Sequence, residues 1–161
     1  MFPGYAGNSA PSMFLSQLAR ERGDLKEALA QITQFTGGSE TSWEGNLLEA
    51  EIRDRMGDSS GARAPLERMI WISPYDVSAH ARLAEIASKA GNHALAIRER
   101  RAIVALEPAD ILGARFELAR ALADSGDVAS ARRELLGVLE QAPSFEKAQS
   151  LLLELRNRNP R

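Results

Sequence analysis

Apolar residues recur at helical spacing along most of the chain, and short turn sequences interrupt them at regular intervals. Near the C-terminus, Phe145, Ala148, Leu151, Leu152 and Leu155 share one side of a predicted helix, and polar residues form its other side. Apolar residues three or four positions apart are typical of a helix that buries one side. The pattern predicts helices near residues 11–22, 25–36, 43–56, 59–72, 77–90, 93–106, 111–125, 128–141 and 145–157.

A repeat underlies the spacing of these helices. Four Gly-Asp or Gly-Asn steps begin at glycines 34, 34 and 35 residues apart. Alanine follows each glycine after five residues, a small residue precedes each by seven, and proline follows three of them after 17. The glycines are Gly23, Gly57, Gly91 and Gly126; the other positions are Ala28, Ala62, Ala96 and Ala131, then Ser16, Ala50, Ala84 and Ala119, then Pro74, Pro108 and Pro143.

Each of these residue types suits a turn between two helices. Glycine readily adopts the left-handed conformation that ends a helix, and the Asp or Asn after it can accept hydrogen bonds from the next helix. Asp24 with Glu27, and Thr41 with Glu44, have the spacing of a capping box. The recurring small residues let two helices approach closely, and proline stops the second helix. The repeat therefore predicts pairs of antiparallel helices joined by tight turns.

These residues resemble the tetratricopeptide repeat family over about residues 9–157. The third and fourth repeats match best, with Leu83 and Leu118 beside the small residues, and we expect both leucines to be buried. The second repeat has Glu49 where the family usually has leucine. The resemblance implies an all-α fold, a right-handed α-solenoid of four helix pairs plus a C-terminal capping helix. The implied organisation is a flexible tail 1–8, repeats 9–40, 41–74, 75–108 and 109–143, a capping helix 145–157 and a tail 158–161.

Composition narrows the function classes. The 161 residues include 44% apolar and 26% charged residues, which is ordinary for a globular protein. Twenty basic and 22 acidic side chains give a formal charge of −2, and a general nucleic-acid binder would usually be basic. The longest aliphatic or aromatic run, residues 69–72, is far short of the about 20 residues that span a membrane. We find no signal peptide at the N-terminus and expect a cytoplasmic protein if the chain is complete.

The sequence carries no recognisable catalytic or metal-binding motif. It has no cysteine, and its only imidazoles are His80, on the packing side of its predicted helix, and His93, at a turn. Dinucleotide, phosphate-loop, zinc-protease and serine-elbow motifs are all missing. We therefore expect no enzyme activity, no metal and no cofactor.

The resemblance instead implies binding along the concave groove formed by the first helices of the pairs. In the family this groove commonly binds an extended peptide or a partner's helix. The groove positions fall ten, six, three and two residues before each turn glycine. They are Met13, Gln17, Arg20 and Glu21; Leu47, Glu51, Asp54 and Arg55; Ala81, Glu85, Ser88 and Lys89; Phe116, Arg120, Ala123 and Asp124.

The groove chemistry indicates a partner of mixed character. The positions carry both signs of charge together with Met13, Leu47 and Phe116, which suits an amphipathic segment. One subtype of the family clamps a C-terminal carboxylate with Lys and Asn, and Met13, Gln17 and Leu48 stand where those would be. The alternative interpretation is that these polar residues only keep the concave surface solvated and bind no partner. The alternative function is a structural segment that packs against a neighbouring domain of a larger protein.

Three residues depart from the repeat pattern. Pro65 predicts a late start or a kink at residues 61–65 of its helix. Arg100 stands where the other repeats have Ile or Leu, and we expect its stem to pack while its head reaches water beside a solvated Glu99. The sharper alternative for Arg100 is a site for a small anion or an acidic partner. Trp71 should point outward, either against the neighbouring turn or towards a partner.

The N-terminal end has no helix before it to cover the first helix. We expect Phe2 and Tyr5 either to fold back over this helix, which carries Phe14 and Leu15, or to leave this end to dock something else. That occupant would be an upstream domain, a partner or a second copy in a homodimer. The alternative is a frayed tail over a modest apolar patch.

Overall fold

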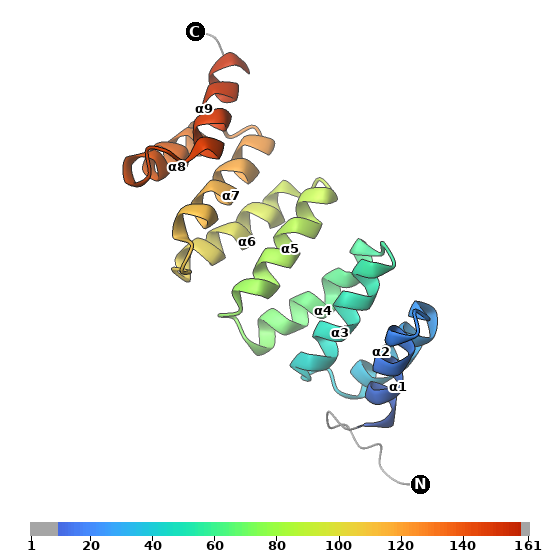
Figure 1. The fold of residues 1–161 in the computed structure, drawn as a ribbon. Coiled ribbons are helices and arrows are strands. Elements are labelled where there is room, and N and C mark those ends of the chain that lie inside the picture. Colours follow the sequence, from blue (N-terminus) through green and yellow to red (C-terminus); the bar gives the residue numbers. More distant parts are fainter. Residues whose placement is uncertain (1–9, 159–161) are drawn as a thin grey trace. The chain divides into compact units, whose positions relative to one another are not determined.

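The computed structural model describes residues 10–158, and within that range the chain forms α-helices and no β-strand (Figure 1). Each predicted helix is present, and each predicted boundary lies within two residues of the observed one. The helices are α1 (Pro11–Glu21), α2 (Leu25–Gly38), α3 (Trp43–Arg55), α4 (Ser59–Ile72), α5 (Val77–Lys89), α6 (His93–Ala105), α7 (Ile111–Asp124), α8 (Val128–Gln141) and α9 (Glu146–Arg158). None of them has the length and apolar character needed to span a bilayer.

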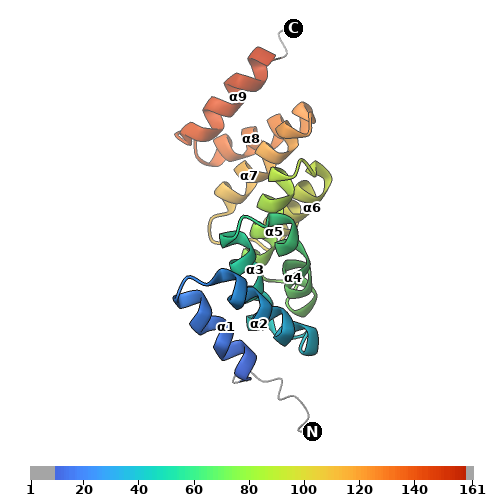
Figure 2. The ribbon, with the colours of Figure 1, turned by 90° about the vertical axis from the view of Figure 1, so that its right-hand side faces the viewer.

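The chain divides into two compact units, Met1–Ala79 and His80–Arg161, and the boundary falls inside α5. In the first unit α1 packs on α2, α2 on α3, and α3 on α4. In the second unit α6 packs on α7 and α7 on α8, and α9 packs on both α7 and α8 (Figure 2). Contacts between neighbouring helices, with a last helix added to the last pair, are the arrangement of an all-α solenoid.

The turns inside the helix pairs form as the repeat predicts. The four turn glycines have φ between +70° and +88°, a region that residues with a Cβ rarely adopt. The Asp or Asn after each glycine accepts a hydrogen bond from the backbone N–H three residues later. These N-caps are Asp24, Asp58, Asn92 and Asp127. Local chemistry therefore sets the start of every second helix of a pair.

The predicted cap at Thr41 is wrong. Ser42 is the N-cap of α3, and its side chain accepts from Gly45 N at 3.1 Å. The Asn46 side chain donates to the carbonyls of Glu40 and Ser42 at 2.8 and 2.7 Å. These two bonds fix the turn before α3, so that the helix begins one residue later than the capping-box spacing predicts.

Pro65 lies inside α4 and is buried. The predicted late start is wrong, because α4 begins at Ser59 and Asp58 caps it through a bond from Gly61 N at 2.9 Å. The cap supplies the bond that anchors the first turn, and the proline follows after that turn is complete. A kink at this position stays a prediction.

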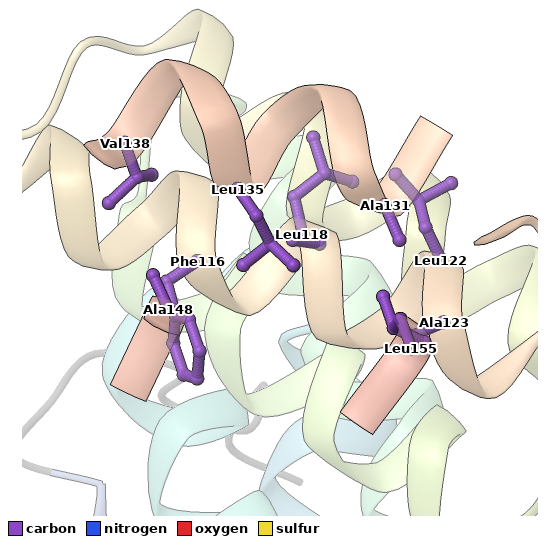
Figure 3. Packing of buried hydrophobic residues seen from close by; sticks show 10 residues of the cluster. Phe116, Leu118, Leu122, Ala123, Ala131, Leu135, Val138, Ala148 and Leu155 are labelled. Carbon is purple, nitrogen blue, oxygen red and sulfur yellow. The ribbon is translucent and has the colours of Figure 1, made fainter. Parts of the chain in front are cut away.

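The recurring small residues lie where the paired helices approach. All eight are buried, with at most 1% of their surface exposed: Ser16, Ala28, Ala50, Ala62, Ala84, Ala96, Ala119 and Ala131. Larger residues fill the space around them, including Ile32 and Ile52 in the first unit and Leu135 and Leu155 in the second (Figure 3). Leu83 and Leu118 are buried, as predicted. This periodic burial is the repeating contact between the two helices of each pair.

At the N-terminal end, Phe14 and Leu15 of α1 are exposed. The predictions for Phe2, Tyr5 and the tail 1–8 concern residues outside the described range. Most of the predicted tail 158–161 also lies outside it. The repeat bounds stay a prediction as well.

Candidate partner-binding surface

A pocket of about 460 Å³ lies between α7 and α9 in the second unit. All four groove positions predicted on α7 line it, and five residues of α9 form the facing wall. The lining residues are Phe116, Arg120, Ala123 and Asp124 from α7, and Glu146, Lys147, Ser150, Leu151 and Glu154 from α9. The pocket therefore brings the predicted groove surface of the last pair together with the terminal helix.

The pocket has an apolar floor because its walls belong to the core of the second unit. Phe116 is 9% exposed and its ring packs at a tilt against Phe145, with ring centroids 5.6 Å apart. Ala148 and Leu155 of α9 belong to the same buried cluster as Phe116 and Leu118 (Figure 3). The contact with Phe145 holds the Phe116 ring at the floor of the pocket.

Charged side chains form the rim. Arg120 lies 2.6 Å from the carboxylate of Glu117, so this cation already has an anionic partner. Asp124, at the end of α7, and Glu146 and Lys147, at the start of α9, are exposed. A pocket with an apolar floor and a charged rim can hold an apolar side chain and orient its polar neighbours.

The prediction that the guanidinium of Arg100 reaches water is wrong. Its side chain is only 15% exposed and lies 3.6 Å from the Glu117 carboxylate. Burial lowers the pKa of the Arg100 guanidinium, and Glu117 opposes that change. Glu117 pairs with both Arg100 and Arg120. Its carboxylate therefore takes the place of the external anion that the alternative hypothesis put beside Arg100.

Glu99 is also not on a solvated face. Its carboxylate is buried, and His80 Nδ1 lies 2.6 Å from one oxygen while Arg98 Nε donates to the other at 2.6 Å. The predicted position of His80 on the packing side is confirmed. The buried carboxylate needs polar partners, and the imidazole from α5 supplies one of them.

The predicted groove positions of the first unit have different environments. Met13 is buried in the core cluster to which α1, α2 and α3 contribute. Arg20 and Glu51 form an ion pair of 3.0 Å that connects α1 to α3. Gln17 and Leu47 are half-buried, and the remaining positions are exposed: Glu21, Asp54 and Arg55.

The predicted positions on α5 are mostly solvated. Ala81 is half-buried and Ser88 is exposed. Lys89 and Glu85 pair along the helix at 2.9 Å. The hydrogen bond from Lys89 lowers the pKa of the Glu85 carboxyl, against the opposing effect of burial.

The sequence analysis missed the α9 wall of the pocket. It assigned α9 to capping, with Glu146, Lys147, Ser150 and Glu154 on a polar outer side. The repeat step offered a signal, because Leu151 lies 35 residues after Phe116 and the last two turn glycines are also 35 residues apart. Continuing that step would have placed α9 in the position of a further first helix.

A second exposed feature lies in the first unit at the end of α4. Trp71 is 89% exposed, which confirms that it points outward. Ile72 and Tyr75 beside it are also exposed, Tyr75 by 78%. The sequence analysis did not identify these two neighbours, which make the exposed surface larger than one aromatic side chain.

Comparison with known proteins gives the fold. No protein-family model and no curated protein matches the sequence. Among solved structures, MamA residues 41 to the end from Desulfovibrio magneticus RS-1 has a TM-score of 0.71 and 20% identity, over 91% of this chain and 82% of that one. YrrB, described as a TPR protein with an unusual peptide-binding site, has a TM-score of 0.66 and 18% identity, over 93% and 86%. TPR-like repeats of a putative kinesin light chain from Podospora anserina reach 0.61 and 19%, over 91% and 92%.

Proposed function

We propose that this chain, which has the fold of tetratricopeptide-repeat proteins, is a non-catalytic scaffold that binds a peptide or a partner segment on the first helices of its pairs. The observation that carries the proposal is the pocket between α7 and α9, where the four predicted positions of α7 meet a facing wall. Its volume of about 460 Å³ falls within the usual size of ligand sites. The peptide-binding site named for YrrB is a property of that protein and supports the proposal by analogy.

Each unit contributes its own groove positions, which are exposed or half-buried except for Phe116 at the floor of the pocket. In the second unit these are Phe116 and Arg120 on α7, and Ala81, Glu85, Ser88 and Lys89 on α5. In the first unit they are Gln17, Leu47, Asp54 and Arg55. Arg20 and Glu51 pair with each other and keep the two helices in place. Met13 acts from the core below this surface.

Peptide selection on the purified chain tests the proposal. A random nonapeptide library displayed on phage should yield enriched peptides, and their dissociation constants are then measured with synthetic copies. The Ser150→Trp variant fills the pocket from an exposed position and should weaken binding at least about tenfold, because its indole takes the place of the peptide side chain. Gln149→Trp places the same side chain at an exposed position on the other side of α9 and should leave binding unchanged. Failure to enrich any peptide, or equal loss in both variants, contradicts the proposal.

A second candidate function is supported by the exposed surface at the end of α4. Trp71, Ile72 and Tyr75 would be covered if this chain were an accessory segment packed against a neighbouring domain of a larger protein. The fluorescence contributed by Trp71, obtained by subtracting the spectrum of a Trp71→Phe variant, tests this. Emission should shift to shorter wavelength in the full gene product relative to this chain alone. An unchanged spectrum contradicts the accessory function.

A further inference from the structure

We infer that the pocket between α7 and α9 selects its partner segment by one aromatic side chain, which packs on the Phe116 ring and beside the Arg120 guanidinium. A charged residue of the partner is not required. This inference rests on the proposed function, because it names the chemical class of the side chain that the same pocket binds.

Small side chains leave space beside the Phe116 ring. Phe116 and Ala123 both line the pocket, and they lie seven residues, or about two turns, apart on one face of α7. Across from them, Ser150 is a small residue on the α9 wall. Three residues before their turn glycines, where the last pair has Ala123, the other pairs have larger polar side chains: Arg20, Asp54 and Ser88. The predicted groove positions of the last pair therefore combine an aromatic ring with space beside it.

The floor of the pocket offers an aromatic contact. The Phe116 ring is 9% exposed and packs at a tilt against Phe145, with ring centroids 5.6 Å apart. Tilted and offset ring pairs gain more stabilisation than their buried area alone provides. An aromatic side chain that enters the pocket adds a further ring contact of this kind, whereas an aliphatic side chain gains only the buried area.

Arg120 offers a second contact that favours a ring. It lines the pocket, and its side chain is 54% exposed. Its Nη2 lies 2.6 Å from the Glu117 carboxylate, which orients the guanidinium from one side. A guanidinium stacks favourably on the face of an aromatic ring, and it gains no such attraction from an aliphatic side chain. The rim therefore adds to the aromatic preference of the floor.

The charges of the rim give no preference for a charged partner residue. Cations and anions both line the pocket: Arg120, Asp124, Glu146, Lys147 and Glu154. A charged side chain of either sign would therefore meet repulsion as well as attraction. It would also lose hydration on the apolar floor, which carries a large cost for a charge. A neutral aromatic side chain avoids both effects.

Changes in the peptide test the inference first. We expect the enriched nonapeptides to share one phenylalanine, tyrosine or tryptophan and no charged position. In a synthetic copy of such a peptide, replacing the aromatic residue by alanine should weaken binding at least about tenfold. Replacing it by leucine should weaken binding about three- to tenfold, because the ring contacts are lost while much of the apolar area remains. Affinity should change by less than about threefold when the ionic strength rises from about 0.05 to 0.5 M, since no exposed charge pair forms.

Two variants of the protein test the contacts with the ring. Phe116→Leu should weaken the aromatic peptide about three- to tenfold more than it weakens the leucine copy. Phe35→Leu, the same change in the core of the first unit, should leave both affinities unchanged. Arg120→Met removes the cation and should weaken the aromatic peptide about two- to fivefold while the leucine copy binds as before. Arg132→Met, an exposed change on α8 outside the pocket, should have no effect.

The outcomes separate this inference from the proposed function. If peptides bind and Ser150→Trp removes them, yet they share no aromatic residue or require a charged one, the inference is overturned and the proposed function stands. The same follows if Phe116→Leu and Arg120→Met weaken the aromatic peptide and its leucine copy equally. Circular dichroism shows whether Phe116→Leu folds, and if it does not, the exposed Arg120→Met alone decides. If no peptide is enriched, both the inference and the proposed function are overturned.

Discussion

Glu49 shows how one buried charge can replace an apolar residue of the repeat. Its carboxylate accepts hydrogen bonds from Thr36 Oγ1 at 2.8 Å, Arg53 Nε at 3.0 Å and Arg68 Nη2 at 3.0 Å. These donors come from α2, α3 and α4, so one side chain connects three helices of the first unit. A buried carboxylate with three donors is satisfied, and its removal takes away the acceptor that these three side chains share.

We predict that Glu49→Ala lowers the free energy of unfolding by about 3 kcal/mol, because Arg68 and Thr36 lose their shared acceptor. Urea denaturation followed by circular dichroism measures the change. Glu44→Ala, an exposed change in the first turn of the same helix, should cost less than about 1 kcal/mol. Similar losses in the two variants would show that burial of the Glu49 network contributes nothing.

At the scale of the helix, turn chemistry determines where each element begins and ends. Gly126 has φ +88° between α7 and α8, and nothing lies within 4 Å of a Cβ built there. The cost of a larger residue at this position is therefore conformational and does not come from a steric contact with another residue. Gly38 ends α2, and a Cβ built there also meets nothing within 4 Å.

We predict that Gly126→Ala destabilises the protein by about 1–2 kcal/mol, the cost of the left-handed conformation for a residue with a Cβ. Gly38→Ala should be neutral or stabilise by up to about 1 kcal/mol, since alanine lowers the entropy of the unfolded chain. Thermal and urea unfolding of both variants measure the difference. Equal effects would contradict the conformational explanation.

The cap of α4 predicts a pH dependence. The Gly61 N–H bond, and next the Arg53 guanidinium at 2.9 Å, lower the pKa of Asp58 below 3.8 in the folded state. A carboxyl whose pKa is lowered by folding stabilises the protein above the unfolded value, and this contribution is lost as the pH falls through the folded value. Asp58 should therefore stabilise the protein at neutral pH and not in strong acid.

Asp58→Asn keeps the capping oxygen, as Asn92 does in α6, and removes the charge. The variant should be less stable than the natural protein at pH 6. The gap should narrow as the pH falls below about 3.8, where both proteins lack this charge. Urea unfolding at several pH values measures the gap, and a gap that is constant with pH would contradict the role of the Asp58 charge.

At the scale of the whole molecule, stability is distributed over neighbouring helices. Every helix contact named above joins elements that are adjacent in the chain or are separated by one helix, as α1 and α3 are and as α7 and α9 are. In such an array, a local defect propagates only through nearest neighbours. Leu118 lies in the core of the second unit, where α7, α8 and α9 meet (Figure 3).

We predict that Leu118→Ala costs about 2–5 kcal/mol, from the lost contacts and the cavity that remains. Hydrogen exchange should become faster in α7, α8 and α9 and stay unchanged in α1 and α2. Leu153→Ala, an exposed leucine on α9, should change neither stability nor exchange by a comparable amount. Uniform acceleration over both units would contradict a stability that depends on nearest neighbours.

The sequence by itself determined the helices, their boundaries, the repeat and the small residues at the helix contacts. These features depend on interactions within a few residues: the left-handed glycine, the Asp or Asn cap three residues before its donor, and the proline after a helix. Periodic burial follows from the same local spacing, which is why Leu83, Leu118 and the outward Trp71 could be predicted.

The tertiary structure alone decided what the repeat spacing could not. Glu99 is buried because His80 meets it from 19 residues away, and Arg100 is covered because Glu117 lies on the next helix. Likewise, the repeat step pointed to α9 as a further first helix, but only its packing on α7 showed that the two helices line a pocket. Whether a charged side chain reaches water or a partner depends on the helix packed beside it, and no local pattern specifies that neighbour.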